Sequence, residues 1–226
     1  MWLGNVFNRQ MPVETKLRYY EISPLLSSET AVFPGDVPFT RRVELDMTHG
    51  SNFTLSSIHT TVHVGAHTDA PSHYQKNGVT IESRALDYYL GDCQVIAVEI
   101  PRGERILPEH LTHARIQAPR VLFKTGSFAD PNRWVPDFNS LSPSLVHFLA
   151  DKGVRLVGID TPSIDPSADK ELHSHHAVQE RDLAILEGIL LGEVPEGVYQ
   201  LIALPLRIEG ADASPVRAIL LPKGAA

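Results

Sequence analysis

Short runs of β-branched and aromatic residues, separated by turn residues, recur along most of the chain. They predict strands near residues 18–22, 53–64, 93–100, 121–125, 154–160, 199–204 and 216–221. Helix signals are fewer. One helix is predicted over residues 144–152, with Ser142 as its N-cap, Pro143 at the first helical position and Gly153 just past its end. A second helix is expected to begin near Pro108. The pattern therefore predicts a strand-rich α/β protein.

A third helix is predicted around Glu187. Leu183, Leu186, Glu187 and Leu190 follow the i, i+3, i+4, i+7 spacing of one helical face. A carboxylate on an otherwise apolar face needs a partner, which makes Glu187 a candidate functional residue. Residues 129–142 and 161–168 are expected to be loops, and the first is long enough to suggest a functional role.

Composition limits the classes of partner. The 226 residues are 42% hydrophobic, which is enough for one substantial core. The net charge is −7 and Lys and Arg form no runs, so nucleic acid and anionic membranes are poor partners. The longest apolar stretches fall well short of the roughly 20 residues of a membrane span. A single cysteine, Cys93, favours a reducing compartment, and we expect a cytoplasmic protein.

Histidines are concentrated in two segments. Seven of the eleven lie within residues 59–73 and 173–176, and His63, His67, Asp69 and His73 fall inside eleven positions. Gly65 permits a sharp turn that brings His67 and Asp69 back toward His63. Two imidazoles and a carboxylate supply the three N/O ligands of a catalytic zinc site. Hydrogen bonding of each imidazole to backbone is the alternative for any one histidine, but a cation satisfies the whole cluster together.

The second histidine cluster precedes Glu187. One of His173, His175 and His176, together with Glu187, would complete a second metal position, with Asp69 bridging the two ions through its two oxygens. For each of these three histidines a solvated loop position is an equal alternative from spacing alone.

Two sets of residues carry a family resemblance. The stretch His63-Val-Gly-Ala-His67-Thr-Asp69-Ala-Pro-Ser-His73 resembles the His-x-Gly-x-His-x-Asp-x-Pro-x-His signature of the cyclase-like metal hydrolases. Residues 158–166, 175–178, 184–187 and 211–218 resemble its bacterial kynurenine formamidase branch. The resemblance runs from about Arg18 to Leu221. It implies a single cyclase-like α/β domain over residues 18–226, with a β-rich core and flanking helices, behind an N-terminal extension of residues 1–17.

The resemblance also implies a function and a site. The reaction would be the metal-dependent hydrolysis of N-formyl-L-kynurenine to L-kynurenine and formate, in a homodimer or homotetramer. One divalent ion, Zn²⁺ or alternatively Mn²⁺, would take His63, His67 and Asp69, and a second would take Asp69, His175 and Glu187. His175 is chosen over His176 because its twelve-residue separation from Glu187 matches the family pattern. His73 resembles the family's proton donor and acceptor.

Phe33 departs from the family pattern. It stands where the family commonly has a substrate-contacting Trp, so ring stacking is retained but the indole N–H is lost. Another amide, an ester or a cyclic imide such as isatin is therefore the alternative substrate. A noncatalytic metal-binding or scaffold domain is a third interpretation, which the open coordination position and His73 argue against.

Overall fold

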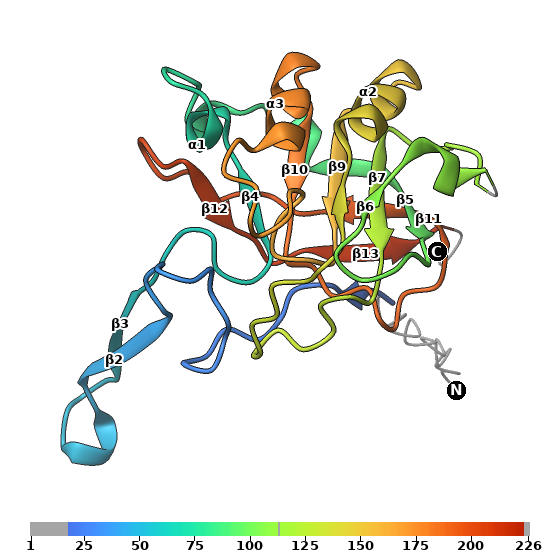
Figure 1. Cartoon of the computed structure of the whole chain (residues 1–226). Helices are drawn as coiled ribbons and strands as arrows, with labels where there is room; N and C mark the ends of the chain where they lie inside the picture. The colour runs from blue at the N-terminus through green and yellow to red at the C-terminus, as the bar shows by residue number, and fades with distance from the viewer. Residues whose placement is uncertain (1–17, 113, 224–226) are drawn as a thin grey trace, which may run out of the picture.

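A seven-stranded mixed sheet forms the centre of the described part of the chain, residues 18–112 and 114–223 of a computed structural model (Figure 1). In spatial order its strands are β1 (Tyr20–Glu21), β13 (Ile219–Pro222), β11 (Gly197–Ile202), β5 (Leu90–Ala97), β7 (Arg120–Lys124), β9 (Leu156–Ile159) and β10 (Ala184–Leu186). The pairs from β1 to β5 are antiparallel, whereas those from β5 to β10 are parallel. The prediction of a strand-rich α/β protein is confirmed.

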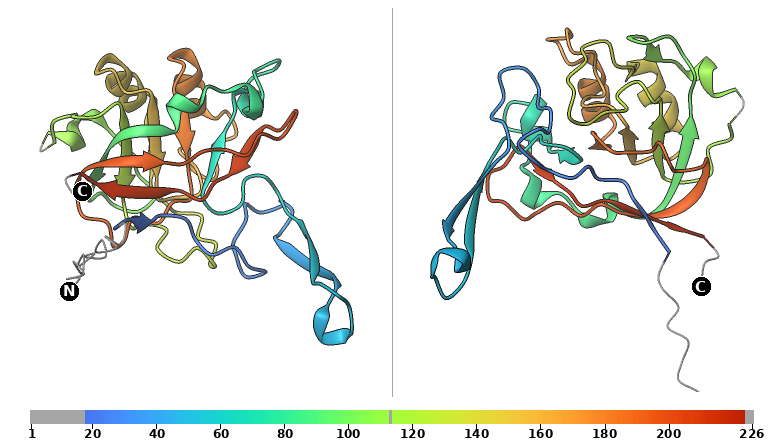
Figure 2. Two further views of the ribbon diagram at one scale, coloured as in Figure 1. Left: turned by 180° about the vertical axis from the view of Figure 1, so that it is seen from behind. Right: turned by 90° about the horizontal axis from the view of Figure 1, so that it is seen from below.

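The core lies on both faces of this sheet. Side chains alternate between faces along each strand. Val121 and Phe123 of β7 therefore pack under α2 (Pro143–Asp151) and α3 (His173–Glu180), while Leu122 faces the opposite cluster. Both helices lie side by side over one face in the views of Figures 1 and 2. Coverage of both faces explains why the parallel strands are apolar at nearly every position.

Helix α2 begins where the sequence predicts. The Ser142 hydroxyl accepts a hydrogen bond from the backbone N–H of Leu145 at 3.1 Å, and Pro143 opens the helix. The element predicted near Pro108 is a 3-10 turn, Pro108–Leu111. Among the described residues, no helix is long and apolar enough to cross a membrane.

The prediction of a helix around Glu187 is wrong. Ala184–Leu186 form strand β10, parallel to β9, and all three residues are buried. A strand covered on both faces is apolar at successive positions, so Leu186 and the buried Leu183 just before the strand also satisfy helical spacing. Gly188, with φ +65°, turns the chain immediately after Glu187. The helix in this region is α3, which carries the second histidine cluster.

The strand predicted over residues 53–64 is shorter than expected and lies outside the central sheet. Leu55–His59 form β3, which pairs with β2 (Thr40–Leu45) in an arm that projects from the body (Figures 1 and 2). Every residue of both strands is exposed, so their apolar residues do not reflect burial in this chain's core.

Short elements complete the fold. They are β4 (His67–Asp69) paired with β12 (Ala213–Pro215), β6 (Arg105–Ile106) paired with β8 (Ser140–Leu141), helix α1 (Pro71–Tyr74), and 3-10 turns at Met47–His49, Ile81–Ser83 and Leu86–Tyr88. The predicted extension, residues 1–17, lies outside the described residues, so the predicted domain division stays a prediction.

Candidate metal centre

Strand β4 presents His67 and Asp69 on one face. Residues two apart on a strand share a face, and the intervening Thr68 points away to donate a hydrogen bond to the Ile185 carbonyl at 2.6 Å. β4 is held on both sides: it pairs with β12, and His67 exchanges two backbone hydrogen bonds with Glu187, at 3.1 and 2.9 Å. The pairing fixes both ligand candidates of β4 beside Glu187.

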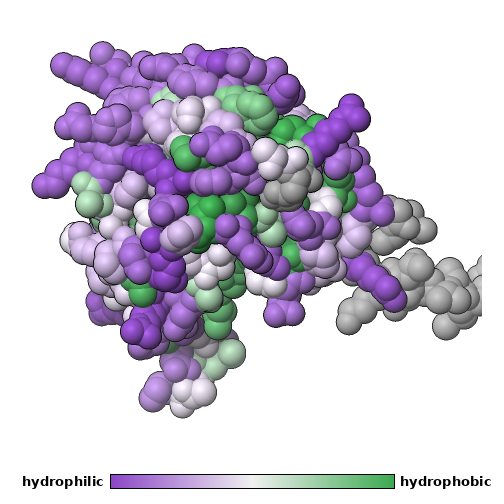
Figure 3. Space-filling view, turned by 45° about the vertical axis from the view of Figure 1, so that its right-hand side comes forward, coloured by the Kyte–Doolittle hydropathy of each residue, from purple (hydrophilic) through white to green (hydrophobic). Residues whose placement is uncertain are grey.

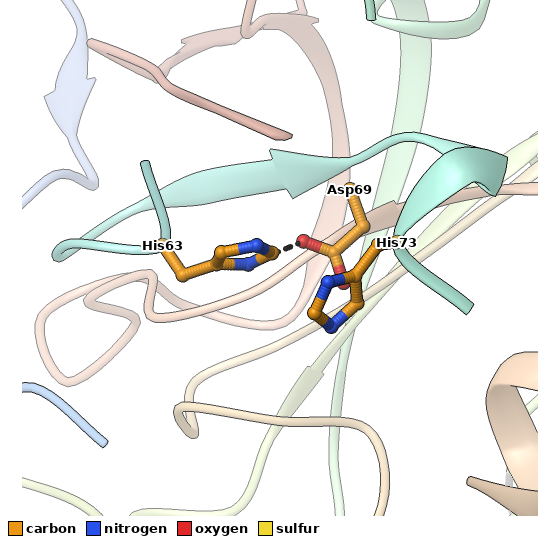
Figure 4. A group of neighbouring side chains, drawn as sticks. All are labelled: His63, Asp69 and His73. Atoms are coloured by element: carbon orange, nitrogen blue, oxygen red, sulfur yellow. Dashed lines mark ion pairs between the residues drawn. The ribbon is translucent and has the colours of Figure 1, made fainter. Parts of the chain in front are cut away.

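A turn at Gly65 brings His63 to the same place. Gly65 has φ +59°, and a Cβ there would lie 2.6 Å from Leu26 Cδ2. His63 Nδ1 lies 3.0 Å from Asp69 Oδ1. Figure 4 shows the His63 ring turned toward this carboxylate. The turn that the sequence predicts is therefore present.

The second histidine cluster contributes one residue. His175 is buried on α3, and its Nε2 lies 3.3 Å from Asp69 Oδ2 and 3.6 Å from Glu187 Oε1. His67 Nε2 lies 3.2 Å from Glu187 Oε2. His176 is exposed, because successive helical residues point in different directions. The structure thus brings His175, rather than His176, to the cluster.

Each of the three clustered imidazoles has a partner on its outer nitrogen. His67 Nδ1 bonds the Gly65 carbonyl at 2.9 Å, and His175 Nδ1 bonds Asp165 Oδ2 at 2.8 Å. His63 Nε2 bonds Asp212 Oδ2 at 3.0 Å. With the proton on the outer nitrogen, the inner nitrogen of each ring has a free lone pair directed at the cluster.

Asp165 is itself firmly held. It accepts hydrogen bonds from the backbone N–H groups of Ser174 and His175. It also accepts one from the Arg105 guanidinium, whose Nη1 lies 2.8 Å from Oδ1. Burial would raise the pKa of Asp165, but these bonds and His175 keep it below its usual range. The charged form of Asp165 is therefore maintained behind His175.

Asp69 provides the test of whether these residues fit a metal. Both its carboxylate oxygens are buried and neither makes a hydrogen bond with a described residue, although three imidazole nitrogens lie 3.0–3.6 Å away. A buried carboxylate without donors is costly, and a cation between these atoms removes that cost. Imidazole and carboxylate ligands suit zinc and manganese. The residues present fit a divalent ion.

The ligand atoms are close enough for more than one grouping. They lie within 4.8 Å of one another in the groups His63, Asp69, His73 and His67, Asp69, Glu187. His67 also lies beside the partners that the resemblance gives it, because its Nε2 is 3.6 Å from Asp69 Oδ1, the oxygen that faces His63 at 3.0 Å. Both groups share Asp69.

Electrostatics favour positive charge at the cluster. Burial alone would lower the pKa of His63, but Asp69 and Asp212 raise it to about 10. Burial would also lower the pKa of His175, but Asp165, Asp69 and Glu187 raise it to about 10. Burial would raise the pKa of Asp69, but His63 and its neighbours hold it well below the ordinary value. A divalent ion and these imidazole protons compete for the same lone pairs.

His73 lies at the opening of the cluster. It sits on α1, one turn after Asp69, with its ring centroid 4.2 Å from that of His63. Its side chain is 32% exposed, against 16% for His63 and 3% or less for His67 and His175. His73 is thus the member of the group that solvent or a ligand reaches most easily.

A cavity of about 690 Å³ opens onto the cluster. Its wall is mostly apolar, and the apolar residues are Pro24, Ala31, Val32, Phe33, Val62, Phe128, Pro131, Pro162, Pro166, Leu172, Ile189 and Leu190. Phe33 lies in this wall, as expected of a substrate-contacting residue. Trp134 supports it edge-on, with ring centroids 4.7 Å apart. Trp134 comes from the long loop that the sequence marks as functional.

Sequence reasoning missed Asp165 and Asp212. Both lie in stretches that carry the family resemblance, residues 158–166 and 211–218, but no spacing rule connects either carboxylate to a histidine far away in the chain. The signal of each is an acidic residue within a family-like stretch, and Asp165 also precedes Pro166, which favours a loop.

Gly188 controls the position of Glu187. A Cβ at Gly188 would lie 2.1 Å from the Gly65 carbonyl oxygen, and its φ is +65°. Gly188→Ala is expected to lower the free energy of unfolding by about 3 kcal/mol, from left-handed strain and overpacking together. Urea denaturation of the metal-free protein measures this loss.

Gly126 is the matched control for that substitution. It has the same φ of +65°, but no atom of the part of the chain that the structure describes lies within 4 Å of the position that a Cβ would occupy there. Gly126→Ala therefore isolates the backbone term, about 1 kcal/mol. Equal losses in the two variants would show that the contact with Gly65 carries no weight.

Known proteins share this fold and sequence pattern. The family model Cyclase, described as "Putative cyclase", matches residues 12–166. Kynurenine formamidase of Bordetella pertussis is 47% identical over 204 residues, 90% of this chain and 97% of that protein. A structure described as a "predicted metal-dependent hydrolase from Bacillus stearothermophilus" matches with a TM-score of 0.77 and 29% identity, over 91% of this chain and 98% of that chain.

A more distant structure supports the fold alone. Isatin hydrolase A from Labrenzia aggregata has a TM-score of 0.73 at 21% identity, over 91% of this chain and 93% of that chain. The predicted cyclase-like fold and family resemblance are confirmed. The chain belongs to the cyclase family, and over nine tenths of its length it is related to a bacterial kynurenine formamidase.

Proposed function

We propose that this protein hydrolyses N-formyl-L-kynurenine to L-kynurenine and formate. The observation that carries the proposal is the cluster of three imidazoles and two carboxylates at the end of a largely apolar cavity, where the Asp69 oxygens accept no hydrogen bond from the described residues. The similarity to kynurenine formamidases selects the substrate. Water adds to the formyl carbon, the C–N bond breaks, and a proton passes to the aryl amine.

We further propose two divalent ions, Zn²⁺ or alternatively Mn²⁺. His63, His67 and Asp69 would hold one ion, and Asp69, His175 and Glu187 the other. When bound, such ions lower the pKa of water and polarise a carbonyl oxygen. Their number and identity are tested by elemental analysis of purified protein.

The residues around the cluster have separate tasks in this proposal. His73 carries the proton to the leaving nitrogen, because it is the accessible imidazole beside the ligands. Phe33 packs against the aromatic ring of the substrate, and the apolar wall limits the entry of bulk water.

Lys170 supports an amino-acid substrate. It is the one Lys or Arg among the described residues that line the cavity, and it is exposed there. The α-carboxylate of N-formylkynurenine is a natural partner for this ammonium group, whereas isatin has no carboxylate. Lys170→Met is expected to raise KM for N-formylkynurenine about 3- to 10-fold and leave kcat within twofold.

The matched substrate for that measurement is formanilide, which lacks the amino-acid side chain. Its KM should not change in the Lys170→Met variant, nor should either KM in Lys152→Met, an exposed lysine at the end of α2. Equal effects on both substrates would remove the proposed carboxylate contact.

Formate release by the zinc-loaded protein tests the function itself. N-formylkynurenine and formanilide are followed by formate release. Simple aryl esters and isatin contain no formyl group, so they are followed by their own hydrolysis products at the same concentration. Preferred turnover of N-formylkynurenine supports the proposal. Turnover of isatin alone would assign the site to the ring-opening hydrolysis of isatin, and metal binding without turnover of any substrate would support a noncatalytic role.

We also propose that the chain works as a homodimer or homotetramer in the cytoplasm. The arm formed by β2 and β3 exposes Val43, Leu45, Met47, Phe53, Leu55 and Ile58 by 40–67%. In Figure 3 it forms the lower end of the molecule, where apolar and polar side chains are mixed. A two-stranded hairpin is marginal alone, so contact with a second copy would stabilise it. Light scattering that gives the mass of one chain would exclude this assembly.

A further inference from the structure

Asp212 is a carboxylate shared by two histidines with different tasks. Its Oδ2 lies 3.0 Å from His63 Nε2 and 3.3 Å from His73 Nδ1. The two rings are close, with centroids 4.2 Å apart. One oxygen atom therefore faces both the candidate ligand His63 and the candidate proton carrier His73.

The backbone holds Asp212 in this place. Its carbonyl accepts the N–H of Ala70 at 2.8 Å, and the carbonyl of Ala211 accepts the N–H of Ile81 at 2.9 Å. The next residue, Ala213, begins β12 and pairs with Asp69. Asp212 is thus tied to the segment that carries both Asp69 and His73, although it lies more than 130 positions later in the chain.

We propose that Asp212 is a positioning residue that sets the tautomer and orientation of both histidines. When Asp212 accepts a hydrogen bond from Nε2–H of His63, the lone pair of His63 Nδ1 is free to bind a metal. Nδ1 is the ring atom that lies 3.0 Å from Asp69. By accepting Nδ1–H of His73, Asp212 leaves Nε2 of His73 free to take up and release the proton.

The other outer partners do only the first of these tasks. Asp165 is completely buried behind His175, and the Gly65 carbonyl serves His67 alone. Asp212, by contrast, has a side chain that is 46% exposed and lines the cavity. It is the member of this outer set that links the ligand group to the accessible histidine.

The part of this inference that concerns proton transfer rests on the proposed function, and the part that concerns His63 rests on metal binding. Asp212→Asn retains a carbonyl oxygen that accepts a hydrogen bond, whereas Asp212→Ala retains none. Zinc affinity, measured by competition with a chelator, is expected to fall about 10- to 100-fold in Asp212→Ala and less in Asp212→Asn. The kcat for formate release should follow the same order, with KM within threefold.

Glu209→Gln is the matched control. Glu209 is an exposed carboxylate three positions earlier in the same loop, so its removal changes the charge without touching the histidines. We expect zinc affinity and kcat within twofold of wild type. A folded Asp212→Ala protein with unchanged zinc affinity and kcat would overturn the proposal, as would an equal loss in Glu209→Gln.

A direct measurement on the wild type does not depend on how the variants fold. Long-range ¹H–¹⁵N correlation spectra of the zinc-loaded protein report which ring nitrogen carries the proton. We expect the proton of His73 on Nδ1 and that of His63 on Nε2; the opposite tautomers would overturn the proposal. If wild type releases no formate from N-formylkynurenine, the proposed function fails, while zinc affinity and tautomers still decide the role of Asp212.

Discussion

Asp69→Ala is expected to abolish metal binding and to reduce formate release by roughly 10³-fold or more. Asp69 is the residue common to both ligand groups, and its two oxygens face His63 and His175. Loss of metal removes several kcal/mol of transition-state stabilisation, which corresponds to a factor of this size. Elemental analysis and the formate assay measure the two effects.

The stability of the same variant should also fall. The folded protein raises the pKa values of His63 and His175 to about 10 and holds the pKa of Asp69 well below its ordinary value. Removal of Asp69 leaves the two buried imidazolium groups without one of their partners, so the metal-free variant is expected to be less stable than the metal-free wild type. Zinc at 100 times its Kd should then stabilise the wild type by about 2.7 kcal/mol and the variant not at all. A zinc-dependent rise in the melting temperature of Asp69→Ala would show that the remaining residues hold the ion without it.

His73→Ala is expected to lower kcat by about 10²- to 10⁴-fold while zinc binding stays within about threefold of wild type. The size is that of a missing general acid–base group, and the retained metal follows from the position of His73 at the exposed rim. The measurement combines single-turnover formate release with metal analysis of the same sample.

His176→Ala provides the comparison for that variant. His176 is an exposed histidine next to His175, and its replacement should leave both turnover and metal content unchanged. Loss of bound zinc in His73→Ala would instead assign His73 to the ligands, in agreement with its grouping beside His63 and Asp69.

The sequence predicts the part of the site in which ligands are close along the chain. His63, His67 and Asp69 share one turn and one short strand, so local geometry brings them together. His175 required the family pattern, because exposure alone separates it from His176 and exposure depends on the packing of α3.

Each failure has its own physical cause. Strand β10 is buried on both faces, so its apolar residues carry no alternation that would distinguish a strand from a helix. β3 shows strand-like residues that are exposed on the arm rather than in the sheet. Asp165 and Asp212 act through contacts with residues 10 and 149 positions away in the chain, which local pattern does not record.

The position of β12 has a consequence for the order in which the protein matures. All five candidate ligands are synthesised by residue 187, but β12, which closes the outer side of β4, follows at Ala213–Pro215. A nascent chain that has just exposed Glu187 therefore carries every ligand without the strand that aligns two of them. Because β4 is held on one side by Glu187 and on the other only by this late segment, metal capture is expected to be one of the last events of folding.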